Sequence, residues 1–106
     1  MQCATVLYPN KEDGRFDFEY YTSKHVPMAA RLLGGNIEVR KGISSPGGAP
    51  AAFVCVATIW IESIDQFQAA IAKNGTQVMG DIPNYTNIQP IIQLDEVLVQ
   101  AKGASR

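Results

Sequence analysis

The sequence predicts an α+β protein of ferredoxin-like type, with the element order βαββαβ, a four-stranded antiparallel sheet and two helices on one face. Three observations support this prediction. Four apolar runs have the length of strands, two longer stretches have the periodicity of amphipathic helices, and turns rich in Gly or Pro separate them. A chain of 106 residues holds one such domain. We expect the domain to span residues 1–100 and residues 101–106 to form a loose tail.

The first half of the chain has the pattern of strand, helix and strand. Residues 2–8 form an apolar run that is followed by a polar turn. Asp17 is a suitable N-cap for a helix that continues to about Leu33, where two glycines follow. We expect the second strand at residues 37–43.

The second half repeats this pattern from a stronger strand. Residues 51–61 are the most strand-like stretch of the chain. An S-x-x-Q capping box that begins at Ser63 starts the second helix, and Gly75 is expected to end it. Residues 76–89 predict a short helical turn and a loop, and the last strand spans about 90–100.

The third strand also predicts a homodimer. In residues 53–61 the side chains of both faces are apolar, and the last strand carries apolar residues on both faces too. Two helices cover only one face of a four-stranded sheet, so the other face needs a partner. The simplest partner is a second copy, and we expect the sheets of two copies to pack face to face.

The composition excludes several classes of partner. Nine Lys and Arg residues and ten Asp and Glu residues give a net charge of −1, which attracts neither nucleic acid nor an anionic membrane. No apolar run reaches the roughly 20 residues that cross a bilayer. The first nine residues lack the basic segment of a signal peptide. We therefore expect a cytoplasmic protein without nucleic-acid or membrane partners.

Motifs for common cofactors are absent from the sequence. There is no glycine-rich phosphate-binding motif, no C-x-x-C and no H-E-x-x-H. A catalytic zinc ion usually takes about three protein ligands, and the chain has one histidine. Cys3 and Cys55 lie in apolar runs and are interpreted as buried thiols. We expect neither a metal nor a cofactor.

The first helix carries the residues that are best suited to chemistry. At about 100° per residue, one face collects five side chains, and they are Phe18, Tyr21, His25, Met28 and Leu32. A histidine can serve as general acid, general base or hydrogen-bond donor near neutral pH. Pro27 interrupts the helix beside His25, and the resulting kink could open a pocket. Alternatively, His25 is a core residue that is bonded to a backbone carbonyl.

Three further candidates lie outside this helix. Trp60 is near the end of a strand and belongs either to a ligand site or to the core or dimer interface. Asp81 and Tyr85 follow the second helix, where they could cap the mouth of a pocket. The alternative for Asp81 is a loop carboxylate in water.

Three segments of the chain resemble the EthD family, which is named after ethyl tert-butyl ether degradation. The segments are FDFEYYTSKHVP (16–27), SIDQFQAA (63–70) and MGDIPNYTNIQPIIQLDEV (79–97). By this resemblance the family's helix-borne histidine is His25, its neighbouring tyrosines are Tyr20 and Tyr21, and its loop acid and aromatic residue are Asp81 and Tyr85. Helical geometry places Tyr20 away from the sheet.

The resemblance implies a dimeric α+β barrel with a ligand between the helices and the sheet of each subunit. The family's namesake is encoded beside a monooxygenase system. Fungal relatives include decarboxylases and dehydratases of aromatic polyketides, and similar barrels include lactone isomerases, cofactor-free oxygenases and haem-degrading enzymes. A haem-degrading role is the weakest of these hypotheses, because the chain offers one candidate axial ligand.

Two main functional hypotheses follow. The first is a cofactor-independent isomerase, dehydratase or decarboxylase of catabolism or polyketide metabolism, acting on a small hydrophobic, aromatic or lactone-like molecule. His25 would move a proton alpha to a carbonyl, Tyr21 would orient the substrate or donate to an oxyanion, and Asp81 would set the tautomer of the histidine. The remaining candidates would bind substrate, and they are Phe18, Met28, Trp60 and Tyr85. The second hypothesis is a non-catalytic carrier or accessory protein for a monooxygenase or degradation pathway, and a purely structural dimer is the third.

Overall fold

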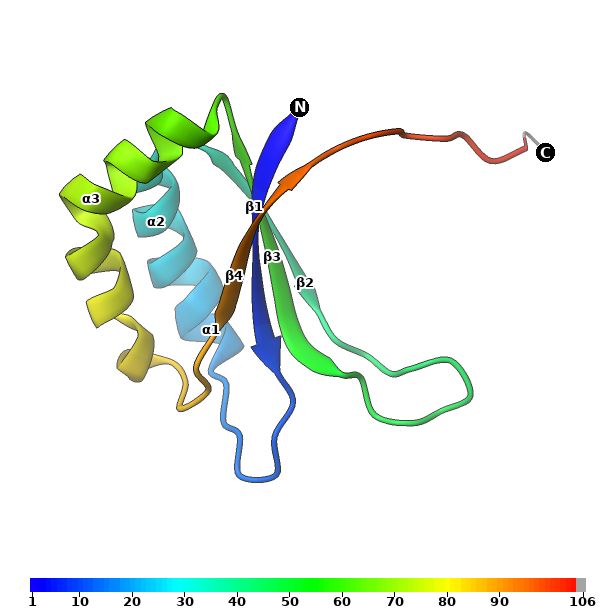
Figure 1. The fold of residues 1–106 in the computed structure, drawn as a ribbon. Coiled ribbons are helices and arrows are strands. Elements are labelled where there is room, and N and C mark those ends of the chain that lie inside the picture. The colour runs from blue at the N-terminus through cyan, green and yellow to red at the C-terminus, as the bar shows by residue number, and fades with distance from the viewer. Residues whose placement is uncertain (105–106) are drawn as a thin grey trace.

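The computed structural model describes residues 1–104 and confirms the ferredoxin-like fold. One antiparallel sheet has the strand order β2-β3-β1-β4, and the helices cover one of its faces (Figure 1). The strands are β1 (Gln2–Pro9), β2 (Asn36–Lys41), β3 (Phe53–Ile61) and β4 (Ile91–Glu96). The helical elements are α1 (Phe18–Tyr20), the π-helical turn η1 (Tyr21–His25), α2 (Val26–Leu33), α3 (Ile64–Gly80) and the 3₁₀ turn η2 (Ile82–Asn84).

Both helices begin at the N-caps that the sequence indicates. The Asp17 carboxylate accepts the Tyr20 backbone N–H at 3.1 Å, and the Ser63 hydroxyl accepts the Gln66 N–H at 3.1 Å. The first helical segment ends at Gly34, whose φ of 76° lies in the left-handed region that glycine adopts without strain. None of the helices in residues 1–104 is long and apolar enough to cross a membrane.

The first helix is not a regular α-helix, and this changes which residues face the sheet. The Val26 N–H bonds to the Tyr21 carbonyl, five residues back, because Pro27 has no N–H for the usual bond to the Ser23 carbonyl. The fully buried side chains recur every four residues, and they are Tyr21, His25, Ala29 and Leu33. Of the five side chains predicted to share one face, Tyr21 and His25 are buried, whereas three are only half-buried, and they are Phe18, Met28 and Leu32.

The second helix is one turn longer than predicted. It continues through Gly75, which is buried and has no left-handed backbone, and ends at Gly80. Val78 lies in this extra turn and packs into the core, which gives the helix an apolar contact beyond the glycine. The short helical turn expected within residues 76–89 is present as η2.

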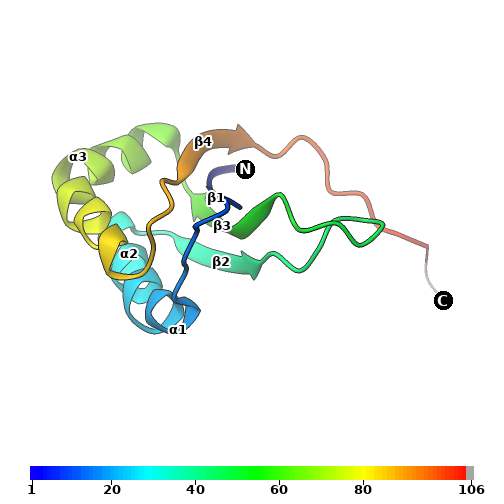
Figure 2. The same cartoon turned by 90° about the horizontal axis from the view of Figure 1, so that it is seen from below.

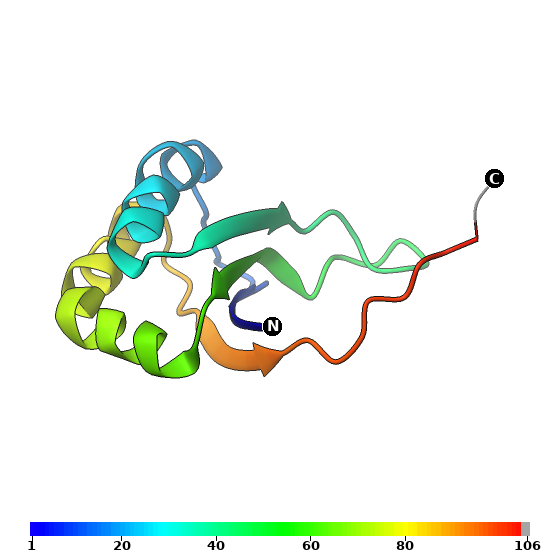
Figure 3. The ribbon, with the colours of Figure 1, turned by 90° about the horizontal axis from the view of Figure 1, so that it is seen from above.

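The last strand is shorter than predicted because its partner ends. The Val97 N–H still donates to the Met1 carbonyl at 2.8 Å, and beyond that point β1 offers no residue to pair with. Residues 97–104 have no regular secondary structure and extend away from the domain (Figure 3). Leu98 and Val99 are therefore exposed. The predicted tail of residues 101–106 falls in this part of the chain, with residues 105–106 outside the described range.

The interior between the helices and the sheet, the two layers seen in Figure 2, divides into two clusters of side chains. We call the first the aliphatic cluster, and it contains Ala4, Ala29, Leu33, Ile59, Phe67 and Val78. We call the second the aromatic cluster, and it contains Tyr8, Tyr21, Cys55, Tyr85 and Ile88.

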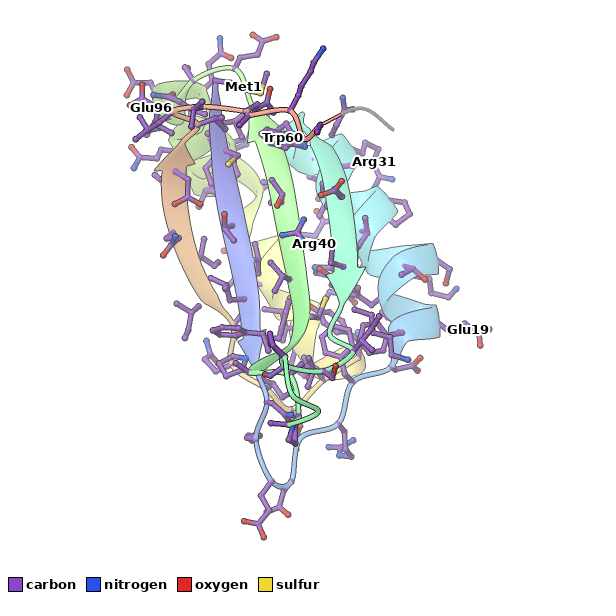
Figure 4. The ribbon with its side chains drawn as sticks, turned by 90° about the vertical axis from the view of Figure 1, so that its right-hand side faces the viewer. Met1, Glu19, Arg31, Arg40, Trp60 and Glu96 are labelled. Atoms are coloured by element: carbon purple, nitrogen blue, oxygen red, sulfur yellow. The ribbon has the colours of Figure 1, made fainter. Side chains whose placement is uncertain are left out.

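The other face of the sheet carries no helix. Figure 4 shows this face, with Arg40 and Trp60 on it. The pairing register places Cys3 beside Trp60 on this face and Cys55 beside Tyr8 on the helix side, so the two buried free thiols lie on opposite faces of the sheet. Val56 also lies on the open face, beside a polar band that includes the Arg40–Glu38 ion pair at 2.6 Å.

Candidate functional site

A cavity of about 360 Å³ lies between the helices and the sheet. At about 30 Å³ per water-sized group it has room for about a dozen non-hydrogen atoms. Three of the residues that line the cavity have hydrogen-bonding side chains, and they are Tyr21, His25 and Gln68. The other lining residues are apolar, and they are Val6, Val26, Ala29, Leu33, Ile37, Ala57, Ile59, Phe67, Ile71, Val78, Met79, Ile82, Pro90, Ile92 and Leu94.

The mouth of the cavity lies between α3 and β4. Met79, Ile92 and Leu94 belong to the cavity wall and are nevertheless exposed, Ile92 by 45%. These side chains are left open because α3 packs mainly against α2 and lies over the centre of the sheet rather than over its β4 edge. Exposed apolar side chains around a concave, apolar space are typical of a ligand site.

His25 is the chemically versatile group in the cavity wall, and both of its ring nitrogens have partners. Nδ1 lies 3.0 Å from Asp81 Oδ2, and Nε2 lies 3.4 Å from the Tyr85 hydroxyl. The carboxylate accepts the Nδ1 proton, which leaves the lone pair of neutral His25 on Nε2. The long contact to Tyr85 holds Nε2 only weakly.

Asp81 has its own set of donors. The Tyr20 hydroxyl donates to Asp81 Oδ1 at 2.7 Å, and the Asn84 side-chain amide donates to the same oxygen at 2.9 Å. Burial by itself raises the pKa of Asp81, but the hydrogen bonds from Asn84, Tyr20 and His25 outweigh it and hold the pKa below its ordinary value. Asp81 is therefore a carboxylate near neutral pH and orients the imidazole.

Tyr20 joins the site although helical geometry placed it away from the sheet. That geometry was correct about the sheet, but Asp81 lies at the end of α3 and approaches the first helix from the side. The hydrogen bond to Asp81, followed by burial, raises the pKa of Tyr20. Tyr20 is thus a donor that holds the carboxylate, and no local pattern in the sequence indicates it.

Behind His25 lies a buried group of phenols. The Tyr8 and Tyr85 hydroxyl oxygens are 2.6 Å apart, and the Tyr21 ring stacks on the imidazole with centroids 5.5 Å apart. Burial raises the pKa of Tyr8 to about 12, and it is also the main cause of the raised pKa values of Tyr21 and Tyr85. The pKa of the neighbouring Cys55 thiol is raised by burial to about 11. These groups stay protonated and act as hydrogen-bonding groups rather than as bases.

The loop that carries Asp81 and Tyr85 is tied to the segment before the first helix. The Asp17 N–H donates to the Tyr85 carbonyl at 2.8 Å, and the buried Thr86 hydroxyl donates to the Arg15 carbonyl at 2.6 Å. The Asn87 side chain adds bonds in both directions to this segment. These contacts fix the loop against the helix that bears His25.

The structure brings some of the candidate residues together and separates others. Tyr21 and His25 line the cavity, and Asp81 and Tyr85 lie behind His25 as its hydrogen-bonding partners. Three candidates are not in the cavity wall, and they are Phe18, Met28 and Trp60.

Each of these three side chains has other neighbours. The Lys41 ammonium lies 5.0 Å above the Phe18 ring, and the Met28 sulfur lies 3.9 Å from the Gln77 amide. Trp60 is on the open face of the sheet, because it alternates with the cavity residue Ile59 along β3 (Figure 4).

No cluster of three or more His, Cys, Asp or Glu side chains suited to a metal ion occurs in residues 1–104. Both ring nitrogens of His25 have partners, so neither is free to ligate a haem iron. The titratable groups around His25 are the carboxylate of Asp81 and the phenols of Tyr21 and Tyr85.

Comparison with known proteins identifies relatives of this fold and sequence. Residues 12–89 match the EthD domain family. A crystal structure of an EthD-like protein from Ralstonia eutropha JMP134 is 39% identical, with a TM-score of 0.88 over 94% of each chain. An EthD family protein from Bacillus halodurans C-125 is 18% identical, with a TM-score of 0.67 over 92% of this chain and 99% of that one. HapK from Hahella chejuensis shares the fold at 17% identity, with a TM-score of 0.53 over 96% and 99% of the two chains. No curated protein matches the chain.

Proposed function

The chain belongs to the EthD family, and we propose that it binds a small hydrophobic carbonyl compound, aromatic or lactone-like, and performs cofactor-independent acid–base chemistry on it. The observation that carries the proposal is one imidazole in the wall of an apolar cavity, backed by a carboxylate at 3.0 Å. When a carboxylate accepts the Nδ1 proton of a neutral histidine, the lone pair is on Nε2, and this nitrogen can act as a general base.

The proposed chemistry is a proton transfer next to a carbonyl. Nε2 of neutral His25 removes a proton from the carbon alpha to the carbonyl, while Asp81 stabilises the imidazolium that forms. Return of the proton from the imidazolium to another carbon of the substrate gives isomerisation, and its transfer to a beta hydroxyl group, which leaves as water while a C=C bond forms, gives dehydration. Ligand entry replaces the 3.4 Å contact between His25 and Tyr85.

Tyr21 has a different part in this proposal. Its ring stacks on the imidazole and forms part of the cavity wall, and its pKa is raised by burial, so its hydroxyl remains a donor. A protonated phenol beside the base stabilises negative charge on the carbonyl oxygen by a hydrogen bond.

His25→Gln tests the proposal. We expect turnover of the active compound to fall by a factor of about 10²–10⁴, the usual contribution of a general base, while the melting temperature changes little. Lys24→Gln changes the exposed neighbour of His25 on the same helix and is the control. If His25→Gln lowers stability and leaves turnover per folded molecule unchanged, His25 is structural.

A second candidate function is binding without turnover, as a carrier or accessory protein. The observation in its favour is that His25 already has a partner at each nitrogen, so that no free base faces the cavity before a ligand enters. Recovery of a bound ligand unchanged after long incubation, with His25→Gln weakening only its affinity, would favour this function.

We also propose that two copies pack through the open faces of their sheets. Val56 and Trp60 give this face an apolar component that no helix of residues 1–104 covers, and a second copy would cover it. Val56→Arg should convert the dimer to a monomer in light scattering. The Ala52→Arg control at an exposed position outside β3 should not.

A further inference from the structure

The cavity has no charged group of its own apart from His25. The side chains in its wall include no Lys, Arg, Asp or Glu. His25, the one group there that can carry a positive charge, lies 3.0 Å from the Asp81 carboxylate. A positive charge on the imidazole is therefore already balanced by Asp81 and is not available to a second anion.

The cations of the surrounding elements do not reach the cavity either. Arg31 is the cation of α2 and Lys73 that of α3, and both are exposed on the sides of their helices opposite the cavity residues. Lys41 lies at the aromatic end but is placed over the Phe18 ring, outside the cavity wall. Within residues 1–104, no compensating positive charge is thus directed at a ligand.

The mouth does not supply a cation. Gln68 is its polar residue, and Asp65 precedes it by one turn of α3. On β4, Glu96 follows Leu94 on the same face of the strand. An anion that enters this mouth loses its hydration and meets only neutral or acidic side chains. The free-energy cost of burying such an unpaired charge is several times that of burying a neutral polar group.

We propose that the cavity selects neutral carbonyl compounds such as ketones, esters and lactones and rejects carboxylates of the same shape, with Asp81 as the residue that enforces the choice. This inference rests on the proposed function and narrows its substrate class. It also means that a reaction that generates a carboxylate, such as opening of a lactone, would expel its own product.

Two ligands of matched shape test the proposal. 2-Acetylnaphthalene is a neutral methyl ketone, and 2-naphthoate has a carboxylate in place of the acetyl group and is ionised at pH 8. Affinities are measured by calorimetry at pH 8, and the NMR signals of His25 show whether a ligand occupies the cavity. We expect the ketone to bind at least about tenfold more tightly than the carboxylate.

Variants of Asp81 separate its charge from the rest of the cavity. Asp81→Asn should reduce the preference for the ketone to less than about threefold, because it removes the negative charge that repels the carboxylate of a ligand at the imidazole. Asp81→Glu keeps the charge and should keep the preference. Glu38→Gln removes a carboxylate from the open face of β2 and should leave the preference unchanged.

The outcomes distinguish this inference from the proposed function. Equal binding of both ligands, or tighter binding of 2-naphthoate, overturns the selection for neutral ligands and leaves the cavity as a ligand site. A preference that persists in Asp81→Asn overturns the role of Asp81. If neither ligand shifts the His25 signals, the ligand site itself is refuted.

Discussion

The aliphatic cluster and the aromatic cluster share β1, β3 and the first helix, yet they differ in what completes them. Phe67 and Val78 of α3 complete the aliphatic cluster, which contains no polar side-chain atom. Tyr85 and Ile88 from the loop after α3 complete the aromatic cluster, in which the Tyr8 and Tyr85 phenols form a hydrogen-bonded group with His25. In this domain α3 contributes apolar surface to the interior, whereas the loop after α3 contributes the polar groups.

The difference shows how one small domain combines a stable core with a buried hydrogen-bonded site. The aliphatic cluster has no hydrogen-bonding side-chain groups, so its contribution to the free energy of unfolding depends on how well its side chains fill the available volume. In the aromatic cluster every polar atom must find a partner, and within residues 1–104 no buried side-chain nitrogen or oxygen lacks one. The cavity lies where the two kinds of interior meet, with His25 on one side and Phe67 on the other.

The largest effect on this comparison is expected from Phe67→Ala. Phe67 is 6% exposed, and its removal should lower the free energy of unfolding by about 3–5 kcal/mol in urea denaturation, because the helix cannot close the space. Phe18→Ala at the aromatic end is the control and should cost less, since Phe18 is only half-buried. Equal losses in the two variants would contradict the assignment of stability to the aliphatic cluster.

A smaller effect is expected from Tyr85→Phe. The change leaves the buried Tyr8 hydroxyl without its partner at 2.6 Å and should lower the free energy of unfolding by about 1–3 kcal/mol. It should also shift the His25 NMR signals, because the contact to Nε2 is lost. Tyr8→Phe should cost less, about 1 kcal/mol, since Tyr85 keeps its contact to His25. The reverse order would show that Tyr8 rather than Tyr85 is the centre of the network.

The smallest effect is a pH dependence confined to the aromatic end. The pKa of Asp81 is lower in the folded protein than its ordinary value of about 3.9. The unfolded chain therefore binds more protons in the acid range, and the stabilisation by Asp81 is complete above about pH 5 and is lost as the pH falls through the folded pKa. The free energy of unfolding, measured from pH 3 to pH 7, should fall less steeply on the acid side in Asp81→Asn.

Phe67→Ala is the matched control for this pH dependence. It removes packing and no titratable group, so its acid slope should equal that of the unmodified chain. An unchanged slope in Asp81→Asn would mean that the hydrogen bonds from Tyr20 and Asn84 do not favour the carboxylate.

The sequence by itself determined the order of the elements, the N-caps at Asp17 and Ser63, and His25 and Tyr21 as residues facing the sheet. These features follow from neighbouring residues, because periodicity, caps and turn residues act over one or two turns of chain. The same local patterns could not show where the second helix ends, since Gly75 breaks a helix or continues it according to what the next turn packs against.

Tertiary structure alone decided how the site is assembled. Asp81 and His25 are 56 positions apart, and Tyr20 and Asp81 are 61 apart, so no periodicity relates them. The π-helical turn at Tyr21–His25 rotated the buried face, and the alternation of β3 placed Trp60 on the side without helices. A pocket wall and a filled core have the same apolar pattern, and only the position of α3, away from the β4 edge, left the space open.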